Sequence, residues 1–136
     1  LRLEVGYPLY GHELDTEHTP DESGLAAIFS ARQEREFTGR AGWLGRAPRG
    51  WLTGLKLDGR RAARAGNVVM DGGEVIGGVT SGVFAPSLEY AIALARLDRQ
   101  LPAGSRLEID LGRVRVGAEV TAVPFYTAGT ARKQLV

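Results

Sequence analysis

Alternating apolar and polar positions dominate the second half of the chain and predict a series of short β-strands. Turn signals separate the apolar runs, among them Asp58-Gly59, Asp71-Gly72-Gly73, Ala85-Pro86-Ser87 and Leu101–Gly104. The predicted strands cover residues 51–57, 67–70, 75–84, 90–97, 106–111 and 114–122. About five or six antiparallel strands with such regular turns predict a small barrel or sandwich.

The stretch from Gly72 to Arg96 is predicted to form the central hairpin of this sheet. Gly77-Gly78 interrupts its first half, which indicates a bulge or a close backbone approach, because glycine has no Cβ to clash there. Thr80-Ser81-Gly82 places small hydrogen-bonding groups at a predicted tight corner. The apolar run Tyr90–Leu97 completes the hairpin, and we expect the rest of the chain to pack around it.

The first 25 residues carry weaker signals. Leu1–Val5 alternates over too short a stretch to separate a strand from the end of a helix. Thr19-Pro20, followed by two acidic residues, is typical of a helix start with Thr19 as N-cap, and Gly24 keeps any such helix short.

The next 25 residues are predicted to lead into the strands. The apolar run Leu25–Phe29 suits a strand or a helix. Thr38–Leu44 predicts a short helix capped by Thr38, and the proline-containing loop Arg46–Gly50 is the predicted boundary between two packing units. The fold class is therefore α+β and mainly β, a small antiparallel β-barrel preceded by a mixed α/β segment.

Composition excludes several classes of chemistry. The 136 residues include no cysteine, which removes disulfides, thiolate catalysis and cysteine zinc sites. No apolar run approaches the roughly 20 residues of a membrane helix. The net charge of +1 argues against a globally basic nucleic-acid binder. The absence of cysteine fits a reducing cytoplasm, which is the predicted location.

Charge is unevenly distributed along the chain. Residues 13–22 are acidic, and the basic stretch 46–64 contains Arg46, Arg49, Arg60, Arg61 and Arg64. A solvated face is the ordinary interpretation of the basic stretch, and an acidic protein partner is the alternative.

Two candidate chemistries fail on spacing. His12, Glu13, Glu17 and His18 do not follow a known metal-ligand spacing, so no metal site is predicted and a solvated acidic loop is expected. Ser81 lies far from both histidines, which argues against a Ser-His-Asp hydrolase.

Short motifs over nearly the whole chain occur in the order found in one known family. The segments are Leu1-Arg2-Leu3-Glu4, Gly6, Pro8-Leu9-Tyr10-Gly11, Glu13-Leu14, Thr19-Pro20, Gly24-Leu25, Phe37-Thr38-Gly39-Arg40, the run from Gly77 to Leu88, Ile92-Ala93-Leu94-Ala95 and Pro124-Phe125-Tyr126. This ordered set resembles the C-terminal part of the aminomethyltransferases, the T-protein of the glycine cleavage system.

The resemblance implies a function and a set of partners. The family moves a one-carbon unit from lipoyl-bound aminomethyl on H-protein to tetrahydrofolate and releases ammonia. The resemblance implies that Arg2 and Tyr126 contact the folate, since the arginine of this R-x-E-x-G motif does so in the family. The residues alone offer an alternative for Arg2, an ion pair with Glu4 on one face of a strand. No catalytic residue is expected in this chain, because the family's catalytic aspartate lies in its N-terminal part.

The resemblance also implies a division of the chain. Residues 1–47 are expected to end a preceding mixed α/β folate-binding domain, and residues 48–136 to form a C-terminal β-barrel domain. The chain opens inside a family motif without methionine, so we expect a fragment whose N-terminal half is missing and which is inactive alone. Alternatives are the folate domain of a dimethylglycine or sarcosine oxidase or demethylase, and a non-catalytic folate-binding module.

Overall fold

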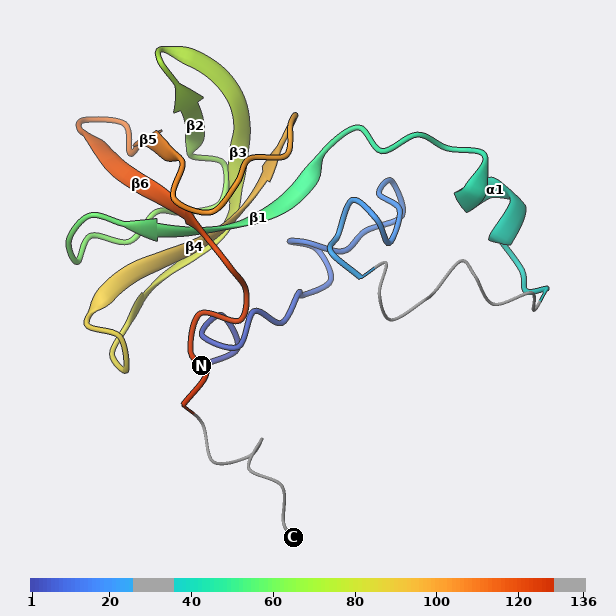
Figure 1. The fold of residues 1–136 in the computed structure, drawn as a ribbon, viewed down its shortest axis with the longest axis horizontal. Coiled ribbons are helices and arrows are strands. Elements are labelled where there is room, and N and C mark those ends of the chain that lie inside the picture. The colour runs from blue at the N-terminus through green and yellow to red at the C-terminus, as the bar shows by residue number, and fades with distance from the viewer. Residues whose placement is uncertain (26–35, 129–136) are drawn as a thin grey trace, which may run out of the picture.

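Six antiparallel strands close into a β-barrel in the computed structural model, which describes residues 1–25 and 36–128 (Figure 1). The order around the barrel is β1-β4-β3-β2-β5-β6, with β6 pairing back onto β1. The elements are α1 (Arg40–Leu44), β1 (Trp51–Leu57), β2 (Val68–Asp71), β3 (Glu74–Ala85), β4 (Tyr90–Leu97), β5 (Arg106–Asp110) and β6 (Arg115–Thr121). The predicted mainly β fold with a small antiparallel barrel is confirmed, and the pairing of β6 with β1 closes the sheet.

The strand β4 is buried on both of its faces. Ala91, Ala93 and Ala95 point into the barrel core with Leu97, whereas Ile92 and Leu94 belong to a second apolar cluster on the outside. Alanines suit the narrow interior of a six-stranded barrel, and a strand covered on both faces reads as a continuous apolar run. The predicted central hairpin is therefore confirmed, with β4 between β1 and β3.

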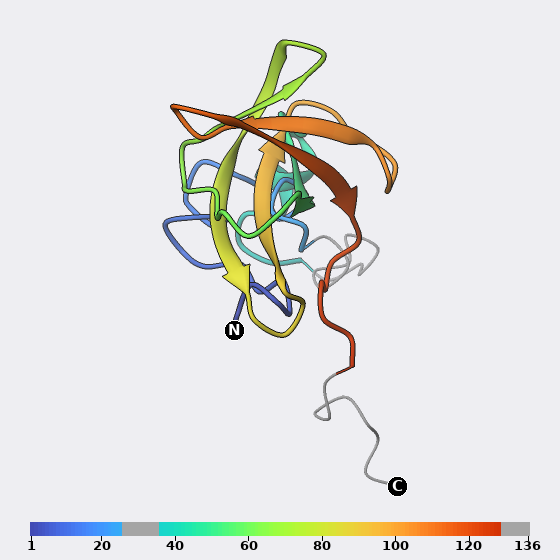
Figure 2. The same cartoon turned by 90° about the vertical axis from the view of Figure 1, so that its left-hand side faces the viewer.

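The outer cluster is completed by segments from the two ends of the described chain. Leu3 is buried against Ile92 and Leu94, and Phe125 packs on the same cluster. Residues 1–25, named here the N-terminal arm, therefore lie against the outside of the barrel rather than apart from it (Figures 1 and 2).

The strand β3 is bulged twice. Against β2, Val69 pairs with Gly77 and Met70 with Val75, so the intervening Ile76 has no partner. Against β4, the register shifts between Val79 and Ser81, so Thr80 has no partner. Gly77 itself marks a close approach, since a Cβ there would lie 2.1 Å from the Arg96 carbonyl oxygen. Thr80, Ser81 and Gly82 lie within β3, so the predicted corner at these residues is wrong. The chain turns at residues 86–89, which confirms the turn signal Ala85-Pro86-Ser87.

Turns without regular secondary structure make up the N-terminal arm. Leu1–Val5 is neither strand nor helix, so Arg2 and Glu4 do not share a strand face. Thr19 and Glu22 exchange the hydrogen bonds of a capping box, with Thr19 N to Glu22 Oε2 at 2.7 Å and Glu22 N to Thr19 Oγ1 at 3.4 Å. The following turn nevertheless ends at Gly24, which has a φ of 72°, so the predicted helix amounts to one turn.

The segment before the barrel contains the one helix of the described residues, α1. Its N-cap is Gly39, without a side-chain cap, so the predicted role of Thr38 is wrong. The buried Trp43 ties this helix to the arm by donating from Nε1 to Asp21 Oδ2 at 2.6 Å. Of the predicted apolar run Leu25–Phe29, only Leu25 is among the described residues. The predicted frayed tail from Gly129 lies outside them. A membrane-crossing helix is not found in the part of the chain that the structure describes.

Candidate functional site

The buried carboxylate of Glu13 joins the N-terminal arm to β3. Glu13 is fully buried, and its Oε1 accepts hydrogen bonds from Ser81 Oγ and from Thr80 Oγ1, the latter at 2.8 Å. Its Oε2 accepts from the Leu9 backbone N–H at 2.9 Å. A fully buried charge is stable only with such partners, so this set of bonds fixes the arm on the barrel. The expected solvated acidic loop is wrong at this position.

The β-bulge at Thr80 explains how two neighbouring hydroxyls reach one oxygen atom. Adjacent side chains in a regular strand point to opposite faces, but a bulge re-aims one of them. The unpaired Thr80 also presents its carbonyl oxygen to the arm, where it lies 3.2 Å from His12 Nδ1. The arm and β3 are thereby connected through both side chains and backbone.

Two more hydrogen bonds hold the backbone of Glu13. Its carbonyl oxygen accepts from Ser23 Oγ at 2.9 Å and from Arg96 Nη2 on β4 at 2.8 Å. Side chain and main chain of the same residue therefore bind different parts of the molecule, and Glu13 has little freedom to move.

Arg2, the leading candidate from the sequence, lies beside this carboxylate. Its Nη2 donates to Ser81 Oγ at 2.9 Å, and its Nη1 donates to the Tyr7 carbonyl at 2.8 Å. Nη1 also lies 3.4 Å from Glu13 Oε2, and a third of the Arg2 side chain remains exposed. Its carboxylate partner is thus Glu13, so the expected ion pair with Glu4 is wrong.

The electrostatics of the cluster favour an ionised Glu13. Burial alone would raise the pKa of Glu13, but the hydrogen bonds from Ser81, Leu9 and Thr80 and the charge of Arg2 outweigh it and hold this pKa below its ordinary value. The cluster is therefore a carboxylate, two hydroxyls and a guanidinium at neutral pH.

Tyr126, the other sequence candidate, lies near the arm through its main chain. Its backbone N–H donates to the Glu4 carbonyl at 2.8 Å, and its side chain is half-buried. Glu4 is itself buried and accepts from the Ser87 backbone N–H at 3.3 Å. Arg2 and Tyr126 therefore both make a hydrogen bond to the backbone of the arm, at Tyr7 and at Glu4. No hydrogen bond joins their side chains in the described part of the chain.

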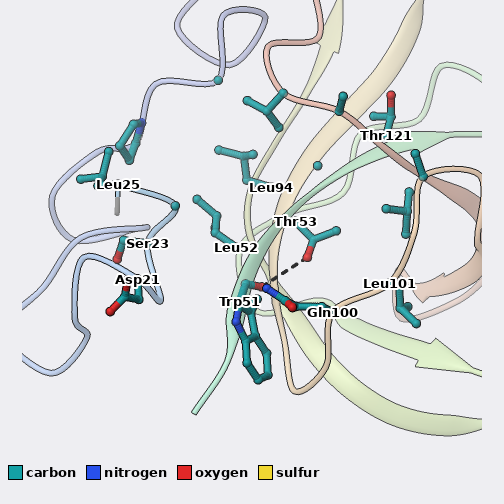
Figure 3. A pocket seen from close by; sticks show the side chains of 18 residues that line it. Asp21, Ser23, Leu25, Trp51, Leu52, Thr53, Leu94, Gln100, Leu101 and Thr121 are labelled. Carbon is teal, nitrogen blue, oxygen red and sulfur yellow. Dashed lines mark hydrogen bonds between the residues drawn. The ribbon is translucent and has the colours of Figure 1, made fainter. Parts of the chain in front are cut away.

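A cleft of about 550 Å³ opens between the arm and the outside of the barrel (Figure 3). Asp21, Ser23 and Leu25 line it from the arm, and Leu52 and Thr121 line it from β1 and β6 (Figure 3). Its walls combine apolar side chains with the Asp21 carboxylate, the Gln100 amide and the hydroxyls of Ser23, Thr53 and Thr121. Neither Arg2 nor Tyr126 lines this cleft.

A second buried carboxylate, Glu22, fixes the other end of the arm. Its Oε1 accepts from the Arg49 backbone N–H at 2.8 Å and lies 3.4 Å from Arg49 Nε. Arg46 Nη2 donates to the Glu17 carbonyl at 2.7 Å, and Arg49 Nη2 donates to the same oxygen. The basic stretch 46–64 therefore divides, because Arg46 and Arg49 hold the arm while Arg60, Arg61 and Arg64 are exposed on the loop between β1 and β2.

Sequence reasoning missed the role of Glu13. The Glu13–Ser81 contact spans 68 residues, and neither residue type nor local spacing indicates it. The one available signal was the hydroxyl pair Thr80-Ser81 inside an otherwise apolar strand. No group of three or more residues placed to hold a metal ion is found within residues 1–25 and 36–128.

Comparison with known proteins assigns the fold to a family. A family model described as "Glycine cleavage T-protein C-terminal barrel domain" matches residues 51–127, which include all six strands. The chain belongs to this family. Relatives named aminomethyltransferase include one from Streptomyces avermitilis, 42% identical over 134 residues, and one from Corynebacterium aurimucosum, 44% identical over 131 residues. Each alignment covers 93% of this chain.

A solved structure gives the same assignment. The crystal structure of glycine cleavage system aminomethyltransferase T from Bartonella henselae superposes with a TM-score of 0.83 at 30% identity, over 93% of this chain and 37% of that one. The chain spans 36% and 35% of the Streptomyces and Corynebacterium relatives, about a third of their length. The resemblance noted from the motifs is therefore confirmed, and the arm as well as the barrel belongs to the aligned region.

Proposed function

We propose that this chain supplies the C-terminal part of an aminomethyltransferase of the glycine cleavage system. The complete protein would transfer the one-carbon unit of lipoyl-bound aminomethyl, carried by H-protein, to tetrahydrofolate and release ammonia. The observation that carries this proposal is the extent of the match, since relatives of that name align over 93% of the chain at about 40% identity.

The proposal divides the chain into two parts. Residues 1–47 would complete a preceding folate-binding domain, and residues 48–136 would form the barrel domain. The start of the family match at residue 51 and the start of β1 at Trp51 support a boundary in this region. The arm nevertheless packs on β4 through Leu3, so the two parts would act as one rigid support.

The residues present suit a folate contact at Arg2. A guanidinium has five N–H groups, and Arg2 uses three of them for its contacts with Tyr7, Ser81 and Glu13. Two of its N–H groups therefore have no partner among residues 1–25 and 36–128, and the side chain is a third exposed. Planar paired donors match a carboxylate or the acceptors of a pterin ring, so Arg2 would bind and orient the folate. Tyr126, whose backbone N–H donates to the Glu4 carbonyl of the arm, would contact the folate as well.

The test is to insert this chain into the Streptomyces avermitilis relative in place of the region that it matches. The chimera, supplied with aminomethyl-loaded H-protein and tetrahydrofolate, should release ammonia and form methylenetetrahydrofolate at a rate close to that of the unaltered relative. The 136-residue chain alone should be inactive, because the catalytic aspartate of the family lies outside the matched part. A folded chimera without activity, or a chain active by itself, would contradict the proposal.

A further inference from the structure

The guanidinium of Arg2 is held by a chain of groups whose hydrogen-bond directions are fixed. A carboxylate only accepts and a guanidinium only donates, so the hydroxyl of Ser81 between them must donate to Glu13 and accept from Arg2. Because the hydroxyl proton of Ser81 points to Glu13, the lone pairs of its oxygen face Arg2. Ionisation of Glu13, which its surroundings favour, leaves both of its oxygens as acceptors and secures this orientation.

The direct contact between Arg2 and Glu13 is the weaker part of this arrangement. Their closest atoms are 3.4 Å apart, longer than the usual 2.7–2.9 Å of a charge-assisted hydrogen bond. The short contacts of Glu13 go to Ser81, Thr80 and Leu9. Glu13 therefore acts on Arg2 mainly through Ser81, supported by an attraction between the two charges.

We propose that Glu13 and Ser81, fixed by the β-bulge at Thr80, are positioning residues that hold the Arg2 guanidinium ready for its ligand. This inference rests on the proposed function, in which the ligand is tetrahydrofolate. Glu13 is fully buried and Ser81 is 6% exposed, so neither touches the ligand directly. Their effect is to keep the two remaining N–H groups of Arg2 in one orientation before binding, which lowers the entropy lost on binding.

The molecule provides a matched control in Glu22. It is also a fully buried carboxylate of the arm, and it also accepts hydrogen bonds from backbone N–H groups and lies against an arginine. Its arginine is Arg49 rather than Arg2, and it has no contact with Ser81 among the described residues. Glu22→Gln therefore loosens the arm without altering the groups that hold Arg2.

The test uses the chimera described above and measures tetrahydrofolate affinity by calorimetry together with thermal unfolding. Glu13→Gln and Ser81→Ala should each weaken binding by roughly three- to tenfold, the range expected for coupled neighbours. Neither change should weaken binding further in an Arg2→Ala background, because both act through Arg2. Glu22→Gln should lower the melting temperature and leave the affinity within twofold.

Each outcome bears on the proposal separately from the proposed function. Losses of affinity that persist undiminished in the Arg2→Ala background would overturn it, as would an equal loss in Glu22→Gln or unchanged affinity in both primary variants. Ser81→Ala decides the question if Glu13→Gln does not fold. A folded, unsubstituted chimera that does not bind tetrahydrofolate would refute the proposed function and the positioning role with it.

Discussion

At the scale of single residues, two buried carboxylates of the same arm solve one physical problem with different partners. The Glu13 carboxylate is stabilised by hydrogen bonds from hydroxyls and the Leu9 N–H and by a nearby guanidinium, and the Glu22 carboxylate by backbone N–H groups and Arg49. Both are acidic residues in a segment whose composition predicts a solvated loop. The carboxylates are buried because their partners come from β3 and from residues 46–49, which no local pattern reveals.

Glu22 should make the stability of the protein depend on acidity. Burial tends to raise its pKa, but the hydrogen bonds from Arg49 and Thr19 lower it from 4.5 to about 2. Because the folded pKa lies below the unfolded one, the stabilisation is complete above pH 4.5 and is lost as the pH falls toward 2. Glu22→Gln should cost about 1–3 kcal/mol at neutral pH and flatten the decline in melting temperature between pH 4.5 and 2. Parallel pH profiles of both proteins in calorimetric scans would contradict this role.

Arg2 should matter for ligand affinity more than for stability. In the chimera, Arg2→Ala should weaken tetrahydrofolate binding by about 1.5–3 kcal/mol, the usual worth of a hydrogen bond to a charged group, or roughly tenfold or more. The melting temperature should fall little, because the side chain is a third exposed and the short hydrogen bonds of Glu13 come from Leu9 and Thr80 rather than from Arg2. Glu4→Ala serves as control and should reduce stability alone, since Glu4 is buried and accepts from Ser87 N. Unchanged folate affinity in Arg2→Ala would rule out a ligand contact.

At the scale of elements, the strands could be predicted from the sequence and the arm could not. Alternation and turn glycines indicate β1, β5 and β6, and Gly72-Gly73, both with positive φ, marks the β2–β3 hairpin as expected. Residues 1–25 have no periodic pattern, because side-chain hydrogen bonds rather than a ladder or helix hold them in place. The capping signal at Thr19 was real but gave only one turn, since tertiary contacts override local propensity.

The paired glycines of β3 should differ sharply in their tolerance of a methyl group. A Cβ on Gly77 would lie 2.1 Å from the Arg96 carbonyl oxygen, whereas one on Gly78 would lie 3.6 Å from the Asn67 carbonyl oxygen, an ordinary contact. Gly77→Ala must push β3 and β4 apart and should cost about 1–3 kcal/mol or more. Gly78→Ala should stay within about 0.5 kcal/mol of the parent protein. Denaturant unfolding of the two variants side by side measures the difference, and similar values would show that the strands can separate freely at Gly77.

At the scale of the whole molecule, the barrel and the arm share an apolar cluster over the outer face of β4. Leu3 and Phe125, near opposite ends of the described chain, both pack there. This explains why β4 carries apolar residues on both faces. The family could be inferred from ordered motifs, whereas the place where the arm packs on the barrel could be found only from the three-dimensional structure.

The surface charge also divides at this scale. Arg46 and Arg49 lie before β1 and donate to the Glu17 carbonyl. Arg60 and Arg61 follow its other end, and the Arg60 guanidinium lies over the Phe84 ring, 4.8 Å from the ring centroid. No ion pair involves Arg60 or Arg61 in the described ranges, so their charge is available to an acidic partner. We expect this second group alone to serve in docking.

In the chimera, Arg60→Glu combined with Arg61→Glu should slow association with H-protein and flatten its salt dependence, because surface charge acts mainly on the rate of encounter. Arg99 follows Leu97, which pairs with Trp51, so it lies near the start of β1. Arg46→Glu combined with Arg99→Glu therefore changes the net charge equally at the opposite end of β1 and should leave association close to that of the parent. Stopped-flow measurement at several salt concentrations gives both rates and slopes. If the two double variants slow association equally, the barrel contributes only its overall charge. If neither does, Arg60 and Arg61 form a solvated face.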